Sequence, residues 1–131
     1  MLGMDKKSSR NGTNTVETLI GARVVIRGDV QFSGGLYVEG KIIGKIFAEE
    51  GSAAVLTISE QGMIDGEVHA PVVIIAGSLH GDIHASERVE LTPTAKVQGN
   101  VHYKVVEMAG GSTLTGRLIH ADIPMAEQTE S

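Results

Sequence analysis

One short pattern occurs six times along the chain and constrains its fold more than any other feature: an apolar residue, any residue, glycine, any residue and a second apolar residue. The six glycines are separated by 16, 22, 15, 18 and 17 residues, which is typical of the coils of a solenoid. The units are Ile26-Gly28-Val30, Ile42-Gly44-Ile46, Ile64-Gly66-Val68, Leu79-Gly81-Ile83, Val97-Gly99-Val101 and Leu114-Gly116-Leu118. The pattern predicts about six coils, with an insertion over residues 49–54 in the longest interval.

Within each unit apolar and polar residues alternate, as they do from Gly66 to Ala70. A period of two indicates a β-strand whose alternate side chains face one core. A second alternating run follows in several units, for example from Leu56 to Ile58, so each coil should hold two or three short strands. Glycine between them permits a bend that a side chain would resist. One coil cannot bury its apolar face alone, and stacking the coils would build a continuous aliphatic column.

These features predict an all-β chain that forms a single-stranded right-handed β-helix of about six coils. Left-handed β-helices also use about 18 residues per coil, but the strict six-residue periods expected of them are missing here. We divide the chain into a disordered N-terminal tail over residues 1–17, a β-helix domain over 18–122 and a disordered C-terminal tail over 123–131, because both tails are polar and aperiodic.

Composition argues against several classes of function. The net charge of −5 and the presence of only two Phe, two Tyr and no Trp disfavour binding of nucleic acid. The absence of cysteine excludes disulfides and thiolate metal sites and is consistent with a cytoplasmic protein. The paired glycines at 34–35 and 110–111 are not followed by the Lys-Ser or Lys-Thr of a phosphate-binding loop, so nucleotide binding is not expected.

The two ends of the predicted solenoid are candidate surfaces for self-association. Neither tail contains an amphipathic helix that could cover a terminal coil, and an uncovered coil leaves apolar side chains and strand edges free to meet another copy. An alternative is that the irregular tails fold over the ends as plugs. The candidate polymer-interface residues are Val24, Ile26 and Val30 at one end and Leu114, Leu118 and Ile119 at the other.

The segment from Thr18 to Gly21, the run from Gly28 to Gly40 (GDVQFSGGLYVEG) and Gly44 resemble the opening signature of bactofilins. The similarity continues through the later glycine units and covers about residues 18–119. It implies a right-handed β-helix, nucleotide-independent polymerisation through the two ends, and a bacterial cytoplasmic scaffold that often lies beneath the inner membrane. It also implies a role in cell shape, cell-wall remodelling by partner enzymes, or positioning of other client proteins.

The N-terminus is a candidate membrane contact. Many bactofilins carry a short apolar segment followed by a basic residue, and Met1, Leu2 and Met4 before Lys6 and Lys7 resemble it loosely, with Asp5 interposed. Such an anchor would be weak in one subunit, and a filament would multiply it. The expected partners are therefore further copies of the chain, the inner-membrane surface and client proteins.

Histidines are the residues most easily taken for a chemical site. His69, His84 and His102 each lie three residues after a repeat glycine, and His120 lies four after it, so the first three should stack on adjacent coils. They could bind a metal or respond to pH. We favour a simpler interpretation, in which this position is an outward-facing polar slot between two apolar residues.

The acids directly after the repeat glycines, Asp29, Glu67 and Asp82, are interpreted as a solvated face. An enzyme of the left-handed β-helix type would use His80 and His84 as its nearest pair, which requires that the turn at Gly81 not separate them. We assign no catalytic residue, metal or cofactor. The expected function is a non-enzymatic filament-forming scaffold. The alternative is a discrete β-helix oligomer that acts as an adaptor or a metal-dependent enzyme through its histidine face.

Overall fold

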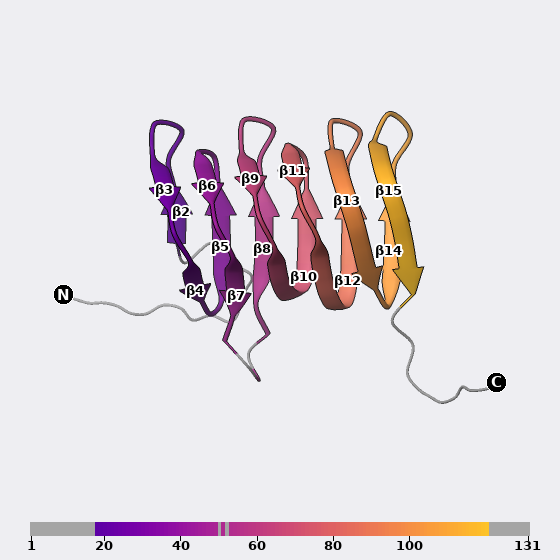
Figure 1. Ribbon diagram of the computed structural model, residues 1–131, viewed down its shortest axis with the longest axis horizontal. Coiled ribbons are helices and arrows are strands. Elements are labelled where there is room, and N and C mark those ends of the chain that lie inside the picture. The colour runs from indigo at the N-terminus through magenta and orange to yellow at the C-terminus, as the bar shows by residue number, and fades with distance from the viewer. Residues whose placement is uncertain (1–17, 50, 52, 121–131) are drawn as a thin grey trace.

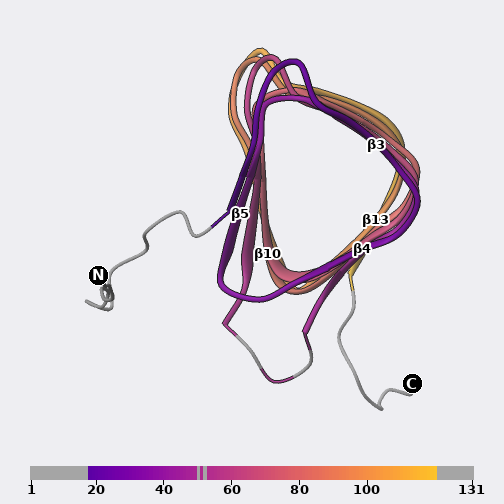
Figure 2. The ribbon, with the colours of Figure 1, turned by 90° about the vertical axis from the view of Figure 1, so that its left-hand side faces the viewer.

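The computed structural model describes residues 18–49, 51 and 53–120, which form a parallel β-solenoid of six coils with no helix among them. Figure 1 shows the coils side by side along the long axis, with the first coil at one end and the last at the other. Viewed from the N-terminal end in Figure 2, the chain runs clockwise as it recedes, so the coil is right-handed. The predicted all-β, right-handed β-helix of about six coils is confirmed.

Each coil has three faces, and every strand pair between coils is parallel. The first face consists of β2 (Thr18–Ile20), β5 (Gly35–Val38), β8 (Val55–Ile58), the second halves of β10 (Val68–Ile75) and β12 (Ile83–Leu91), and β14 (Val105–Met108). The second face consists of β3 (Val25–Arg27), β6 (Lys41–Ile43), β9 (Met63–Asp65), β11 (Ser78–His80), and the first halves of β13 (Lys96–Tyr103) and β15 (Thr113–His120).

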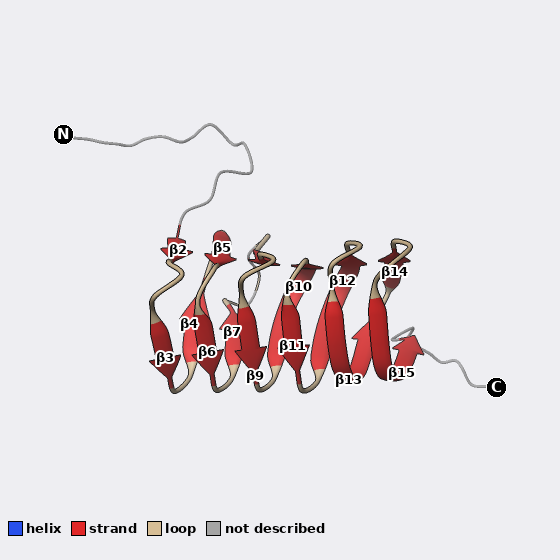
Figure 3. Ribbon diagram, turned by 90° about the horizontal axis from the view of Figure 1, so that it is seen from above, coloured by secondary structure: helices blue, strands red, loops and turns tan. Residues whose placement is uncertain are grey.

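The third face consists of β4 (Val30–Phe32), β7 (Ile46–Ala48), the first halves of β10 and β12, and the second halves of β13 and β15. Figure 3, a view from above, shows the second-face strands β3, β6, β9 and β11 side by side in front, with the third-face strands β4 and β7 behind them. The predicted insertion lies between β7, which ends at Ala48, and β8, which begins at Val55. It therefore interrupts the passage from the third face to the first and leaves the stacking of the coils unchanged.

A column of aliphatic side chains fills the interior, and no polar or charged residue is buried among the described residues. On the third face Val30, Ile46, Val68, Ile83, Val101 and Leu118 lie in register. On the second face Ile26, Ile42, Ile64, Leu79, Val97 and Leu114 do so. These two core-facing rows are the first and last residues of the six sequence units, so the repeat itself builds the core.

The repeat glycines form the corner between the second and third faces. Gly81 has a φ of 142°, which side chains rarely adopt. A Cβ placed on Gly81 would also overlap the backbone carbonyl of Gly66 in the preceding coil. Glycine is therefore required here both by the bend and by the close approach of two coils.

Candidate functional site

The two ends of the solenoid expose side chains that would be buried in any inner coil. In the third-face row Val101 has no exposed surface, whereas Leu118, one coil further on, is 40% exposed. Ile26, Val30 and Leu114 are likewise only partly buried, although the residues in register with them on the next coil are buried. The difference arises because the terminal coils lack a neighbour on one side. Each end therefore presents an apolar surface that continues the core.

The backbone is also incomplete at both ends. Among the described strands, β2, β3 and β4 pair only with β5, β6 and β7. At the other end β14 pairs only with β12, and β15 only with β13. The outer edge of each terminal strand has no strand partner in the described part of the chain, and such an edge is a template for pairing with another strand.

The structure separates the six candidate interface residues into two groups. Ile26, Val30, Leu114 and Leu118 belong to the core-facing rows that reach the ends. Val24 and Ile119 lie in the terminal coils but not in these rows: Val24 is exposed before β3, and Ile119 pairs with His102. All six residues therefore lie in the terminal coils, but only four belong to the rows that reach the ends, and the part of Val24 and Ile119 in an interface stays a prediction.

The candidate membrane contacts, Met1, Leu2, Met4, Lys6 and Lys7, lie outside the described residues, as do the two predicted tails. Within the described ranges there is no helix of the length and apolarity needed to cross a membrane.

The predicted histidine stack is present on the outer side of the third face. His69 and His84 have ring centroids 4.4 Å apart and nearly parallel planes, and His84 and His102 repeat this geometry. Phe47 extends the row by one coil, with its centroid 5.2 Å from that of His69. We call these four residues the histidine row. The row results from the register of the parallel strands, in which His69 pairs directly with His84 and His84 with His102.

The other two histidines lie elsewhere. His120 pairs with Tyr103 rather than His102, and its Nε2 lies 3.0 Å from the carbonyl oxygen of Lys104. His80 lies in β11 on the second face. The turn at Gly81 therefore separates His80 from His84, and these two do not form the pair that the left-handed enzyme alternative requires.

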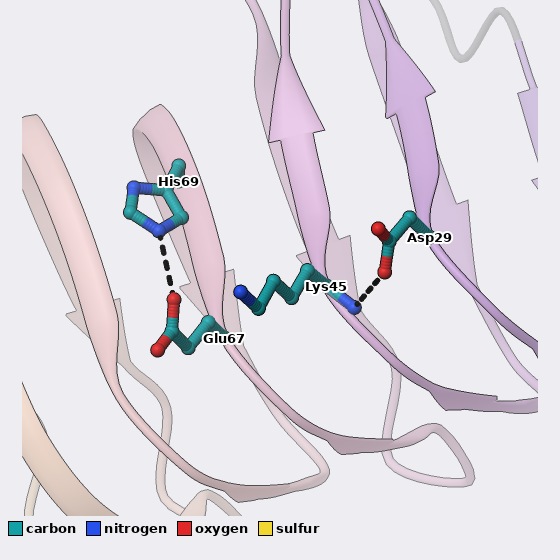
Figure 4. Close-up of polar contacts among 4 residues, drawn as sticks. All are labelled: Asp29, Lys45, Glu67 and His69. Atoms are coloured by element: carbon teal, nitrogen blue, oxygen red, sulfur yellow. Dashed lines mark hydrogen bonds and ion pairs between the residues drawn. The ribbon is translucent and has the colours of Figure 1, made fainter.

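The acids after the repeat glycines have specific partners, which sequence reasoning missed. Asp29 Oδ1 accepts a hydrogen bond from the backbone N–H of Lys45 at 3.2 Å, shown in Figure 4. Asp82 Oδ1 accepts one from the backbone N–H of Asn100 at 3.1 Å. Glu67, one methylene longer, instead lies with Oε1 3.2 Å from His69 Nε2. These acids tie one coil to the next or bind a histidine, and are not merely a solvated face.

A hollow of about 490 Å³ opens over the histidine row, with Pro71 and Ser86 also in its lining. Burial lowers the pKa of His84 below its usual value, and the neighbouring imidazoles of His69 and His102 lower it further. Glu67 and Asp82 oppose this shift. Because a low pKa favours the uncharged form, His84, the middle of the three imidazoles, is held neutral, with a nitrogen lone pair available.

The comparison with known families agrees with the architecture. The sequence model of the family described as "Bactofilin: Polymer-forming cytoskeletal" matches residues 18–119, nearly the whole described solenoid. The chain belongs to the bactofilin family. The resemblance drawn from the opening signature is thereby confirmed, and the family is a cytoskeletal one.

Two curated relatives are bactofilins of Myxococcus xanthus strain DK1622. Bactofilin BacO is 29% identical over 119 residues, covering 91% of this chain and 89% of BacO. Bactofilin BacP is 25% identical over 111 residues, covering 85% of this chain but only 45% of BacP. The chain thus spans most of one relative and less than half of the other. No solved structure matches it.

Proposed function

We propose that the chain is a subunit of a bacterial cytoskeletal scaffold that polymerises end to end, without nucleotide and without catalysing a reaction. The observation that carries this proposal is the exposure of Leu118 in a core-facing row whose inner members are buried. Another terminal coil placed against this surface would bury the row and pair the open strand edges. The polymer-forming character of the family supports the same conclusion.

Burial of apolar surface and completion of parallel ladders would drive this assembly. Apolar area removed from water contributes roughly 25 cal/mol per Å², and each added ladder satisfies backbone groups that otherwise bind water. Because both ends of one subunit can associate, growth does not stop at a dimer. We further propose a cytoplasmic filament whose N-terminal segment contacts the inner-membrane surface and which positions client proteins such as cell-wall enzymes.

The test is negative-stain electron microscopy of the purified chain, without nucleotide or added metal, beside Leu118→Asp. The substituted carboxylate would remain hydrated in the monomer, since Leu118 is partly exposed, but would be buried and unpaired at a junction, where its cost is high. We expect long thin filaments from the parent and short particles from Leu118→Asp.

Thr115→Asp is the matched control, because Thr115 lies in the same strand, is exposed, and pairs with Gln98 outside the core-facing rows. It should still form filaments. Uniform small particles from the parent, or filaments from Leu118→Asp equal to those of the parent, would contradict the proposal and favour a discrete oligomer.

A further inference from the structure

We propose that Glu67, His69 and His84 form a binding site for one divalent transition-metal ion of the Zn²⁺ class. One ligand atom from each of the three side chains lies within 4.8 Å of the other two. Glu67 and His69 come from the start of the third face in one coil, and His84 comes from the adjacent coil. The site is contained within one chain, so it does not depend on filament formation.

The donor set suits this class of ion. Imidazole nitrogen and carboxylate oxygen are common Zn²⁺ ligands at about 2.0–2.2 Å, and three protein ligands with a fourth position for water are typical of open zinc sites. The carboxylate supplies the negative charge that two neutral imidazoles lack. The hollow over the row leaves room for water at the fourth position.

The existing contacts bring the ligands close to a binding geometry. Glu67 Oε1 already lies 3.2 Å from His69 Nε2, and Figure 4 shows both side chains on the outer surface of the same strand region. The rings of His69 and His84 are almost parallel at 4.4 Å, so binding one ion requires them to tilt toward each other. Both Glu67 and His69 are about two-fifths exposed, and side chains with that much freedom can make this adjustment.

The chain favours this position over the equivalent one a coil later. Asp82 precedes His84 by two residues, as Glu67 precedes His69, but its carboxylate accepts the backbone N–H of Asn100. The carboxylate of Glu67 accepts no backbone N–H in the described part of the chain, and its longer side chain reaches His69 instead. His102 then serves as the ring against which His84 stacks. The neutral state of His84, favoured by its surroundings, suits a metal ligand because binding need not displace a proton.

The test is a calorimetric titration of the full, chelator-treated chain with ZnCl₂ at pH 7.5, beside His84→Asn and Glu67→Gln. Glutamine can still hydrogen-bond to His69 but lacks the charge, so Glu67→Gln removes the ligand with little change in shape. We expect one ion per chain in the parent and a loss of affinity of at least about tenfold in each variant, since even residues that only orient ligands cost 10–100-fold.

His80→Asn is the matched control, because His80 is exposed on the second face. The affinity of this variant for Zn²⁺ should equal that of the parent. Circular dichroism shows whether each variant keeps its β-structure. Binding should also disappear near pH 5, where protons compete for the imidazoles. An affinity unchanged in His84→Asn and Glu67→Gln, an equal loss in His80→Asn, or no saturable binding by the parent would overturn the proposal.

Discussion

Neighbouring coils approach so closely at most of the repeat glycines that one added carbon atom would overlap the backbone of the preceding coil. Gly81 shows why the repeat tolerates no other residue: its φ of 142° is strained for a side chain, and a Cβ would meet the Gly66 carbonyl. Gly110 lies in a turn where a Cβ would meet nothing within 4 Å. Both positions are glycine, but only Gly81 belongs to the repeat.

We therefore expect Gly81→Ala to destabilise the fold and Gly110→Ala to leave it almost unchanged. The backbone strain alone should cost about 1–3 kcal/mol, and the overlap with the preceding coil adds to it. Urea unfolding followed by circular dichroism measures both variants. Equal stability of Gly81→Ala and the parent would mean that the coils can separate locally, and the close contact would not then be needed.

The sequence predicts contacts between side chains where register alone determines them. It does not predict them where two similar side chains at the same offset have different partners. The stacking of His69, His84 and His102 follows from their equal offset from the glycines, because register places them in one row. The partner of Glu67 did not follow, since Asp82 occupies the same offset and binds backbone instead. The difference of one methylene determines which partner each carboxylate reaches, and only coordinates show it.

Most strands are only three or four residues long, too short to be stable alone, and each is held by parallel neighbours in adjacent coils. The alternation of apolar and polar residues predicted these strands and their core-facing residues. It did not show that β10, β12, β13 and β15 continue around a corner from one face to the next. Periodicity reports which side chains face the core, whereas a corner within a strand depends on tertiary packing.

Ile64 and Ile26 test how far stability depends on having a coil on both sides. They are in the same second-face row, but Ile64 is fully buried and Ile26 is only partly buried in the first coil. Ile64→Ala should lower the free energy of unfolding by about 2–5 kcal/mol, as for other large cavities. Ile26→Ala should lower the free energy of unfolding clearly less. The comparison uses urea unfolding in the Leu118→Asp background, which is expected not to assemble.

The row and the residue type are the same in this pair, so each variant is the other's control. Equal costs would indicate that the end of the solenoid is covered in the monomer, as the plug alternative supposes. That result would remove the main argument for assembly through the N-terminal coil.

The whole molecule is a rod, and the number of coils determines its length along the solenoid axis. Six layers about 4.8 Å apart make about 29 Å, so an end-to-end filament should advance by about this distance per subunit. Cryo-electron microscopy of the filaments should give that axial spacing, together with a layer line near 4.8 Å. A lateral arrangement of rods would lack the subunit spacing and would contradict stacking through the ends.

The parallel ladders also determine how such a filament would respond to force. Hydrogen bonds between coils run close to the direction of the solenoid axis, because they connect parallel strands that encircle it and lie side by side along it. Tension along the filament would therefore be shared at each layer by three ladders at once, with no slack segment among the described strands to extend. A filament built this way would resist stretching and would break between two layers, so it would be stiff and brittle rather than extensible.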